Sequence, residues 1–206
     1  MNTKAKIPAA LAALAAAVLT PGCVGDILAP REDPTQFYVI NGAKEFERVD
    51  GIADIPLNIS LVRIPSYMAR NQIVTSQKDS ARVDISDVDR WPEVPIDSFT
   101  RVISSNIARI SGSDEIYTYP SLALGIGAAE LRVNVMECMG ELGGELYFSA
   151  RWEILKSEGS KVAKRKTDIF EVRIPAGDTY DSYVRAMEKA LYELSLDIAK
   201  SLKEFK

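Results

Sequence analysis

Few residue types in this sequence could carry out chemistry, because its 206 residues include no His and only two Cys. The lack of His excludes Ser-His-Asp triads, Cys-His pairs and imidazole acid–base catalysis. Two Cys residues cannot form a Cys₄ zinc site or a disulfide-rich scaffold. Carboxylate and lysine chemistry stay open, but the spacing of the acidic residues marks out no pair. The sequence therefore predicts no catalytic residue, no metal ligand set and no cofactor.

Two short motifs resemble ligand-binding loops but lack the context that such loops need. Gly125-Ile126-Gly127 begins like a dinucleotide-binding loop, but the strand-like Leu131–Cys138 follows where a helix should begin. Three Asp residues cluster within 84–89, but Trp91 stands where a calcium loop needs another oxygen ligand. We interpret the first motif as a flexible loop and the second as solvated acidic residues.

Cys23 is the residue whose surroundings predict a chemical modification. Lys4 and Lys6 precede an uncharged stretch, Ile7–Leu19. This stretch is too short for a bilayer span of about 20 residues, but it suits the apolar region of a secretory signal. Leu19–Gly22 followed by Cys23 resembles a bacterial lipobox, in which the Cys carries the lipid. The alternative is an ordinary secretory signal with an incidental Cys.

The N-terminal prediction divides the chain into three parts. Residues 1–22 are the predicted lipoprotein signal peptide, residues 23–35 hold the lipidated Cys and a tether, and residues 36–206 form one folded domain. The chain has 25 basic and 29 acidic residues, a net charge of −4. This balance gives no electrostatic basis for binding nucleic acid or anionic lipid. Membrane attachment would therefore depend on acyl chains such as palmitate.

Apolar periodicity in the third part predicts an α/β (α+β) domain, a two-layer sandwich of a largely antiparallel sheet with helices on one face. The predicted strands are Gln36–Asn41, Pro56–Ile64, Gln72–Ser76, Arg82–Ile85, Leu131–Cys138, Glu145–Leu155 and Val162–Ile174. The predicted helices are Ile96–Ile110 and Thr179–Phe205.

The same patterns make three local predictions. Alternation within Pro56–Ile64 places Leu57, Ile59 and Leu61 on one face of that strand. A slip in alternation near Thr167–Phe170 predicts a β-bulge there. Asp178 is expected to be the N-cap of the final helix.

A cluster of aromatic, Arg and turn residues predicts a contact surface for a partner. Its central members are Tyr67, Arg70, Gln72 and Trp91, and aromatic and Arg side chains are enriched at protein interfaces. The alternative is that Tyr67 and Trp91 fill the edge of the core. A second place for the interface is the polar face of the strand Glu145–Leu155.

Several stretches of the chain resemble one known family in the right order. Ser60–Thr75 is similar to a V-x-[IL]-P-x-Y-L-x-[RS]-x-Q-I-V motif, and Asp89–Glu93 is similar to an F-x-R-W-A-E-P element. Gly144–Trp152 and the helix that begins near Tyr180 also agree, as does the lipobox. Together they resemble the ABC-type transport auxiliary lipoproteins of the PqiC/YmbA type.

The resemblance implies a lipid-anchored protein on the periplasmic side of the outer membrane, and Val24 after Cys23 agrees with outer-membrane sorting by resemblance to enterobacterial rules. It implies that the protein docks an MCE-domain partner and its inner-membrane complex, which move lipids between envelope membranes, and that it is not an enzyme. A homo-oligomer stays open. The alternatives are an assembly lipoprotein of a secretion or surface-fibre channel and a hydrolase of envelope polymers.

Overall fold

The computed structural model describes residues 33–119 and 128–206 of the chain. The predicted signal peptide, Cys23, most of the tether and the Gly125–Gly127 motif lie outside the described residues. The fold that follows is that of the unit Thr35–Lys206.

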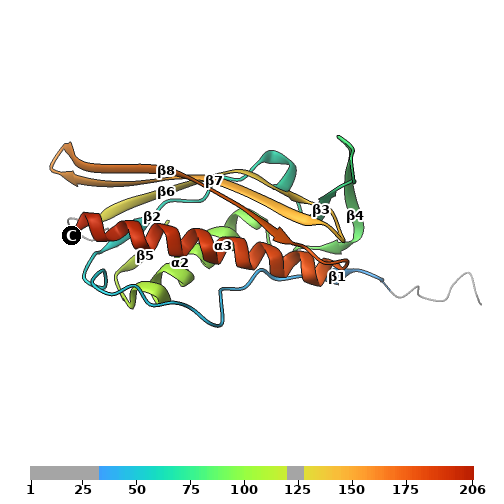
Figure 1. Cartoon of the computed structure of the whole chain (residues 1–206), viewed down its shortest axis with the longest axis horizontal. Coiled ribbons are helices and arrows are strands. Elements are labelled where there is room, and N and C mark those ends of the chain that lie inside the picture. Colours follow the sequence, from blue (N-terminus) through green and yellow to red (C-terminus); the bar gives the residue numbers. More distant parts are fainter. Residues whose placement is uncertain (1–32, 120–127) are drawn as a thin grey trace, which may run out of the picture. The chain divides into compact units, whose positions relative to one another are not determined.

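The described residues form two β-sheets, two α-helices and two short 3-10 helices (Figure 1). One sheet has the strand order β1-β4-β3, and the other has the order β5-β2-β6-β7-β8. In chain order the elements are β1 (Gln36–Phe37), β2 (Leu57–Ile59), η1 (Ser66–Met68), β3 (Gln72–Ser76), β4 (Val83–Arg90), α2 (Pro95–Ser111), β5 (Ile116–Thr118), β6 (Ala129–Gly140), β7 (Glu145–Glu158), β8 (Lys161–Pro175), α3 (Tyr180–Leu202) and η2 (Lys203–Phe205).

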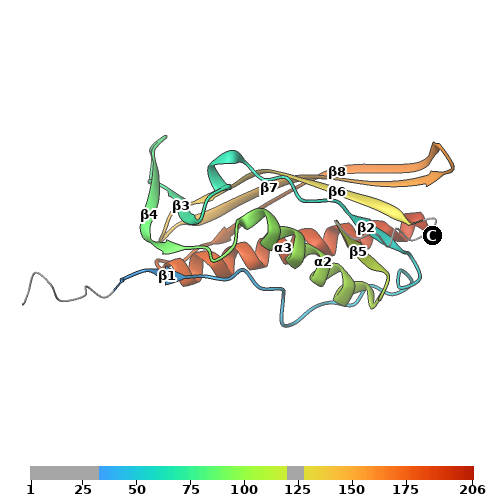
Figure 2. The same ribbon diagram turned by 180° about the vertical axis from the view of Figure 1, so that it is seen from behind.

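Both α-helices lie on the same side of the long strands β6, β7 and β8, which the opposite views of Figures 1 and 2 show alike. This arrangement confirms the predicted two-layer α+β sandwich. The long strands pair antiparallel, as predicted, but β2 runs parallel to both β5 and β6, and β1 runs parallel to β4. The separate three-stranded sheet was not predicted from the sequence.

The β6–β7 hairpin forms the centre of the larger sheet and agrees with the predicted alternation. The helix-facing side chains of β7 are all fully buried, and they are Leu146, Phe148, Ala150, Trp152 and Ile154. The indole Nε1 of Trp152 donates to the Asp197 carboxylate on α3 at 3.0 Å. Gly143 in the connecting turn has φ of 80°, a left-handed conformation that favours glycine. The hairpin therefore joins the sheet and the α3 layer.

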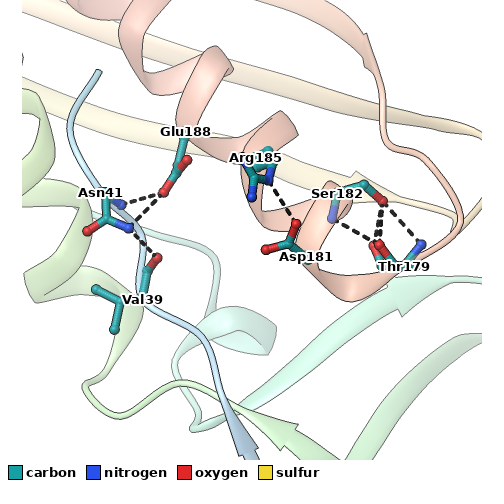
Figure 3. A network of polar contacts seen from close by, with 7 residues as sticks. All are labelled: Val39, Asn41, Thr179, Asp181, Ser182, Arg185 and Glu188. Atoms are coloured by element: carbon teal, nitrogen blue, oxygen red, sulfur yellow. Dashed lines mark hydrogen bonds and ion pairs between the residues drawn. The ribbon is translucent and has the colours of Figure 1, made fainter. Parts of the chain in front are cut away.

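The two helices begin and end at residues with clear capping chemistry. Pro95 occupies the first turn of α2, and Gly112 ends that helix with φ of 69°. Thr179, not the predicted Asp178, is the N-cap of α3: its hydroxyl accepts from the Ser182 amide at 3.2 Å, and Ser182 Oγ accepts from the Thr179 amide at 3.1 Å (Figure 3). Thr179 is the N-cap because this reciprocal capping box satisfies two backbone donors.

Neither helix is apolar over a long enough stretch to cross a bilayer, and no other helix in the described part of the chain is either.

The predicted strand Gln36–Asn41 is reduced to a two-residue β1, and the chain then runs as an irregular strap over α2 and α3. Side chains of the helices bind its backbone. The Asn41 amide donates to Glu188 at 2.7 Å, as Figure 3 shows, and the Glu47 amide donates to the Tyr192 hydroxyl at 2.8 Å. These helix side chains accept the backbone hydrogen bonds that a neighbouring strand would otherwise accept, so this segment does not need to pair in a sheet.

The predicted alternation in the second strand holds only as far as Ile59. Ile59 pairs with Leu131 on β6, and Arg63 pairs with Asn134. The chain after β2 therefore has one residue more between these two pairs than β6 has. The extra residue is a bulge, and a bulge exchanges the two faces of a strand. Leu61, which was predicted to share a face with Leu57 and Ile59, is therefore 41% exposed, while Val62 is fully buried.

The bulge predicted near Thr167–Phe170 is also wrong, because β7 and β8 keep a continuous register there. Their register shifts instead between Lys156 and Ser157, close to the hairpin tip. The slip in alternation has another cause: Ile169 is 46% exposed on the open face of an edge strand. An apolar residue at such a position does not require a bulge.

Candidate functional site

The structure brings together the two segments that the sequence predicted as a contact surface. Tyr67 lies in η1, and Gln72 begins β3, where it pairs with Arg90 at the end of β4. The Trp91 amide then donates to the Asn71 carbonyl at 2.6 Å. Residues 67–72 and 90–91 are therefore neighbours although about twenty positions separate them in the chain.

Trp91 does not lie on this surface as an exposed side chain, which corrects the prediction. Its exposed fraction is 4%, and it belongs to the hydrophobic core together with Met68 and Ile73. A large apolar side chain next to the hairpin β3–β4 is more stable when it is removed from water. The core alternative considered for Trp91 is therefore correct.

Tyr67 is half-buried and binds the backbone of β6. Its hydroxyl accepts from the Cys138 amide at 3.2 Å and lies 3.5 Å from the Cys138 carbonyl oxygen. Burial raises the pKa of this phenol above its ordinary value. Cys138 lies just after the position at which the register between β6 and β7 shifts, between Val135 and Glu137. The Tyr67 hydroxyl therefore supplies the acceptor for a backbone amide near this irregularity.

We expect Tyr67→Phe to lower the free energy of unfolding by about 1–3 kcal/mol, because the change leaves the buried Cys138 amide without its acceptor. Urea denaturation of the purified protein measures this difference. Tyr147→Phe is the matched control, since the Tyr147 ring stacks under Arg173 and keeps that contact without its hydroxyl. Equal stability of both variants would show that the Tyr67 hydroxyl bond does not matter.

Arg70 and Gln72 are the partly exposed members of the predicted surface. The Arg70 Nε is buried and has no hydrogen-bond partner among the described residues, although the residue as a whole is partly exposed. Gln72 lies at the first position of β3. These two polar side chains can still contact a partner, and their role in binding stays a prediction.

The acidic cluster of β4 is not uniformly solvated, which corrects another prediction. Asp89 is 8% exposed, and it accepts from Ser86 Oγ at 2.8 Å and from the Tyr38 hydroxyl at 3.0 Å. Asp84 and Asp87 remain exposed. No group of three potential metal ligands occurs within residues 33–119 and 128–206. Asp89 therefore connects β4 to the chain after β1.

Cys138, at the end of the predicted strand Leu131–Cys138, is a free and buried thiol. Burial raises the pKa of this thiol far above its ordinary value. Because the thiolate is the reactive form, we expect iodoacetamide to leave Cys138 unmodified in the native protein and to alkylate it in urea. Mass spectrometry of the two samples measures the difference. A disulfide-linked dimer on non-reducing gels that Cys138→Ser removes would contradict burial of the thiol.

A groove of about 760 Å³ lies along the chain after β2 and the strands β6, β7 and β8 of the larger sheet, and Ile96 in the first turn of α2 also lines it. Four arginines line it, and they are Arg63, Arg132, Arg151 and Arg165. Glu153 is the acidic side chain that lines the same groove, and it forms ion pairs with Arg132 and Arg165. The polar alternation of β7 pointed to the polar side chains that this strand contributes, but the groove also needs Arg63, which the bulge after β2 places beside β6.

The described fold and its surfaces define a class of protein: a small α+β domain whose candidate sites are an interface region and an arginine-lined groove. A family model described as the ABC-type transport auxiliary lipoprotein component matches residues 38–199. The chain belongs to this family, and it is thus an auxiliary lipoprotein of a transport system. No curated relative matches the chain.

Two solved structures share the fold. The first is described as an uncharacterised protein; it has a TM-score of 0.65 and 17% identity, and the match covers 82% of this chain and 98% of that one. The second is a protein from Xanthomonas campestris with a TM-score of 0.57 and 12% identity, and the match covers 80% of this chain and 93% of that one. At such low identity these likenesses concern the fold alone.

Proposed function

We propose that this protein is a non-catalytic docking component of an MCE-type system that moves lipids between the envelope membranes. In this proposal acyl chains on Cys23 hold it in the outer membrane, and the folded domain faces the periplasm and binds the MCE-domain partner. The observation that carries the proposal is the family match over residues 38–199, together with the lipobox that ends at Cys23.

The predicted contact surface supports a docking role. Arg70 and Gln72 are partly exposed, and the same segment contributes to the core, because Met68 and Ile73 are buried and Tyr67 packs against the core. A rigid support of this kind lowers the entropic cost of binding, because the contact residues need little further ordering. A partner would then contact polar side chains that lie next to the packed core.

Co-purification tests this proposal. Full-length protein carrying a C-terminal tag is extracted in detergent from cells that also express an MCE-domain protein of the same organism, and the captured partner is quantified. We expect the wild type to capture this partner. An Arg70→Ala/Gln72→Ala variant is expected to bind roughly 30-fold more weakly, if the pair contributes about 2 kcal/mol as interface hot spots do.

The control is Arg82→Ala, which removes an exposed arginine at the other end of the β3–β4 hairpin. It should capture as much partner as the wild type, and all three proteins should melt within about 2 °C of one another. If the wild type captures no MCE-domain protein, the proposed function is contradicted. If the Arg70→Ala/Gln72→Ala variant captures as much partner as the wild type, the docking surface lies elsewhere on the domain.

A further inference from the structure

The strand register places two arginines in one row on the open face of the larger sheet. Arg63 forms an isolated parallel bridge with Asn134 on β6, and Asn134 pairs with Arg151 on β7. All three residues are exposed and line the groove. We call Arg63, Asn134 and Arg151 the arginine row. Two strand spacings separate the two arginines, so their Cα atoms are roughly 10 Å apart.

The other arginines of the groove already have acidic partners. Arg132 binds Glu130 through two nitrogens at 2.8 Å and reaches Glu153 at 3.6 Å. The Arg132 guanidinium lowers the pKa of the Glu130 carboxyl. Arg165 also pairs with Glu153. These ion pairs occupy the carboxylates of Glu130 and Glu153, and they fix the arginines that take part in them.

Arg63 and Arg151 have no such partner. Neither guanidinium forms an ion pair with a residue in the described part of the chain. Two like charges in one row repel each other, and a bound anion would remove that repulsion. The Asn134 amide between them is a further hydrogen-bond donor. The row therefore combines two guanidinium groups with one amide and has no acidic partner among the described residues, in a protein whose net charge is −4.

We propose that the arginine row binds a carboxylate side chain of an extended, acidic segment of the partner protein. Guanidinium groups bind carboxylates through paired hydrogen bonds, which add geometry to charge. Leu61, 41% exposed, and Ile96 line the same groove, so an apolar side chain next to the acidic one would also find a contact. This inference rests on the proposed docking function and assigns the chemistry of the partner.

The groove fits a protein segment better than a lipid. Its floor includes Val62, Val133 and Trp152, which are packed into the core with exposed fractions of 3% or less. Core side chains therefore fill the space beneath the groove, and its apolar contacts, among them Leu61 and Ile96, suit a single side chain better than a long acyl chain. The net negative charge of the chain also opposes attraction to an anionic membrane surface. Short-range contacts to a carboxylate avoid both difficulties.

A peptide probe tests the proposal directly. A fluorescein-labelled peptide of sequence Ser-Glu-Leu-Glu-Ser-Glu-Leu-Glu is titrated with the full-length protein in detergent, and fluorescence anisotropy is measured at low and at high salt. A peptide with Gln in place of every Glu is the comparison. We expect the acidic peptide to bind and the Gln peptide not to bind. We expect Arg63→Gln/Arg151→Gln to weaken binding at least about tenfold (about 1.4 kcal/mol).

The control variant is Arg82→Gln/Arg173→Gln, which removes the same charge from a second groove that borders β6, β7 and β8. It should change affinity less than about twofold. Both variants replace exposed arginines and should melt like the wild type. Equal peptide affinity of the wild type and Arg63→Gln/Arg151→Gln would overturn the proposal. It would also be overturned if phosphatidylglycerol vesicles, but not the peptide, bound through these arginines.

Co-purification separates this inference from the proposed function. If the wild type and Arg63→Gln/Arg151→Gln capture equal amounts of the MCE-domain partner, the docking function stands and the arginine row is not the contact. If the wild type captures none, the proposed function fails, and the peptide titration alone decides whether the row binds an acidic segment.

Discussion

Cys23→Ser is expected to move the protein from the membrane fraction into the soluble periplasmic fraction. Each buried CH₂ of an acyl chain contributes about 0.8 kcal/mol to membrane binding, so two or more chains make the anchor effectively permanent. Mass spectrometry of the wild-type protein extracted from membranes should show an acylated Cys23 at the mature N-terminus, and cell fractionation should show the release of the variant.

The control for this change is Cys138→Ser, which alters the other cysteine of the chain and should leave the protein in the membrane fraction. A mature N-terminus at another residue, without lipid, would contradict the lipobox prediction. So would a Cys23→Ser protein that stays in the membrane fraction after washing with high salt.

Trp91→Ala is expected to lower the free energy of unfolding by about 3–5 kcal/mol, because it removes a large side chain from a packed site and leaves a cavity. Trp91 is 4% exposed and packs in the main core. For a domain of this size each kcal/mol lowers the melting temperature by roughly 2–4 °C. Thermal and urea denaturation of the purified variant measure both quantities.

Phe37→Ala is the matched control for Trp91→Ala. Phe37 pairs with Arg90, the residue before Trp91, but its side chain is 64% exposed. We expect its truncation to change stability by less than about 0.5 kcal/mol. A Trp91→Ala protein as stable as the Phe37→Ala protein, but with weaker partner binding, would return Trp91 to the contact surface.

Much of the fold could be predicted from the sequence, because local patterns determine it. Alternation in Glu145–Leu155 reports which side chains of β7 face the helices, since successive residues of a strand point to opposite faces. The 3.6-residue period of Ile96–Ile110 reports the buried stripe of α2 for a similar reason. Burial of Cys138 also followed from its place in such a strand.

Features that depend on pairing could not be predicted in this way. The bulge between Ile59 and Arg63 is defined by comparison with β6, which lies some seventy residues later in the chain. Without that partner strand, Leu61 looked like a core residue. The same holds for Ile169, whose place on an edge strand explains its exposure.

The candidate sites show the same division. The sequence by itself determined that chemistry based on His is excluded, that Leu19–Cys23 resembles a lipobox, and that the chain resembles the auxiliary lipoproteins, because each depends on residue type and local order. Only the tertiary structure decided that Trp91 is buried and that Arg63 lies in one row with Arg151. Burial and the formation of an ion pair depend on which distant segments meet, and local periodicity carries no information about such contacts.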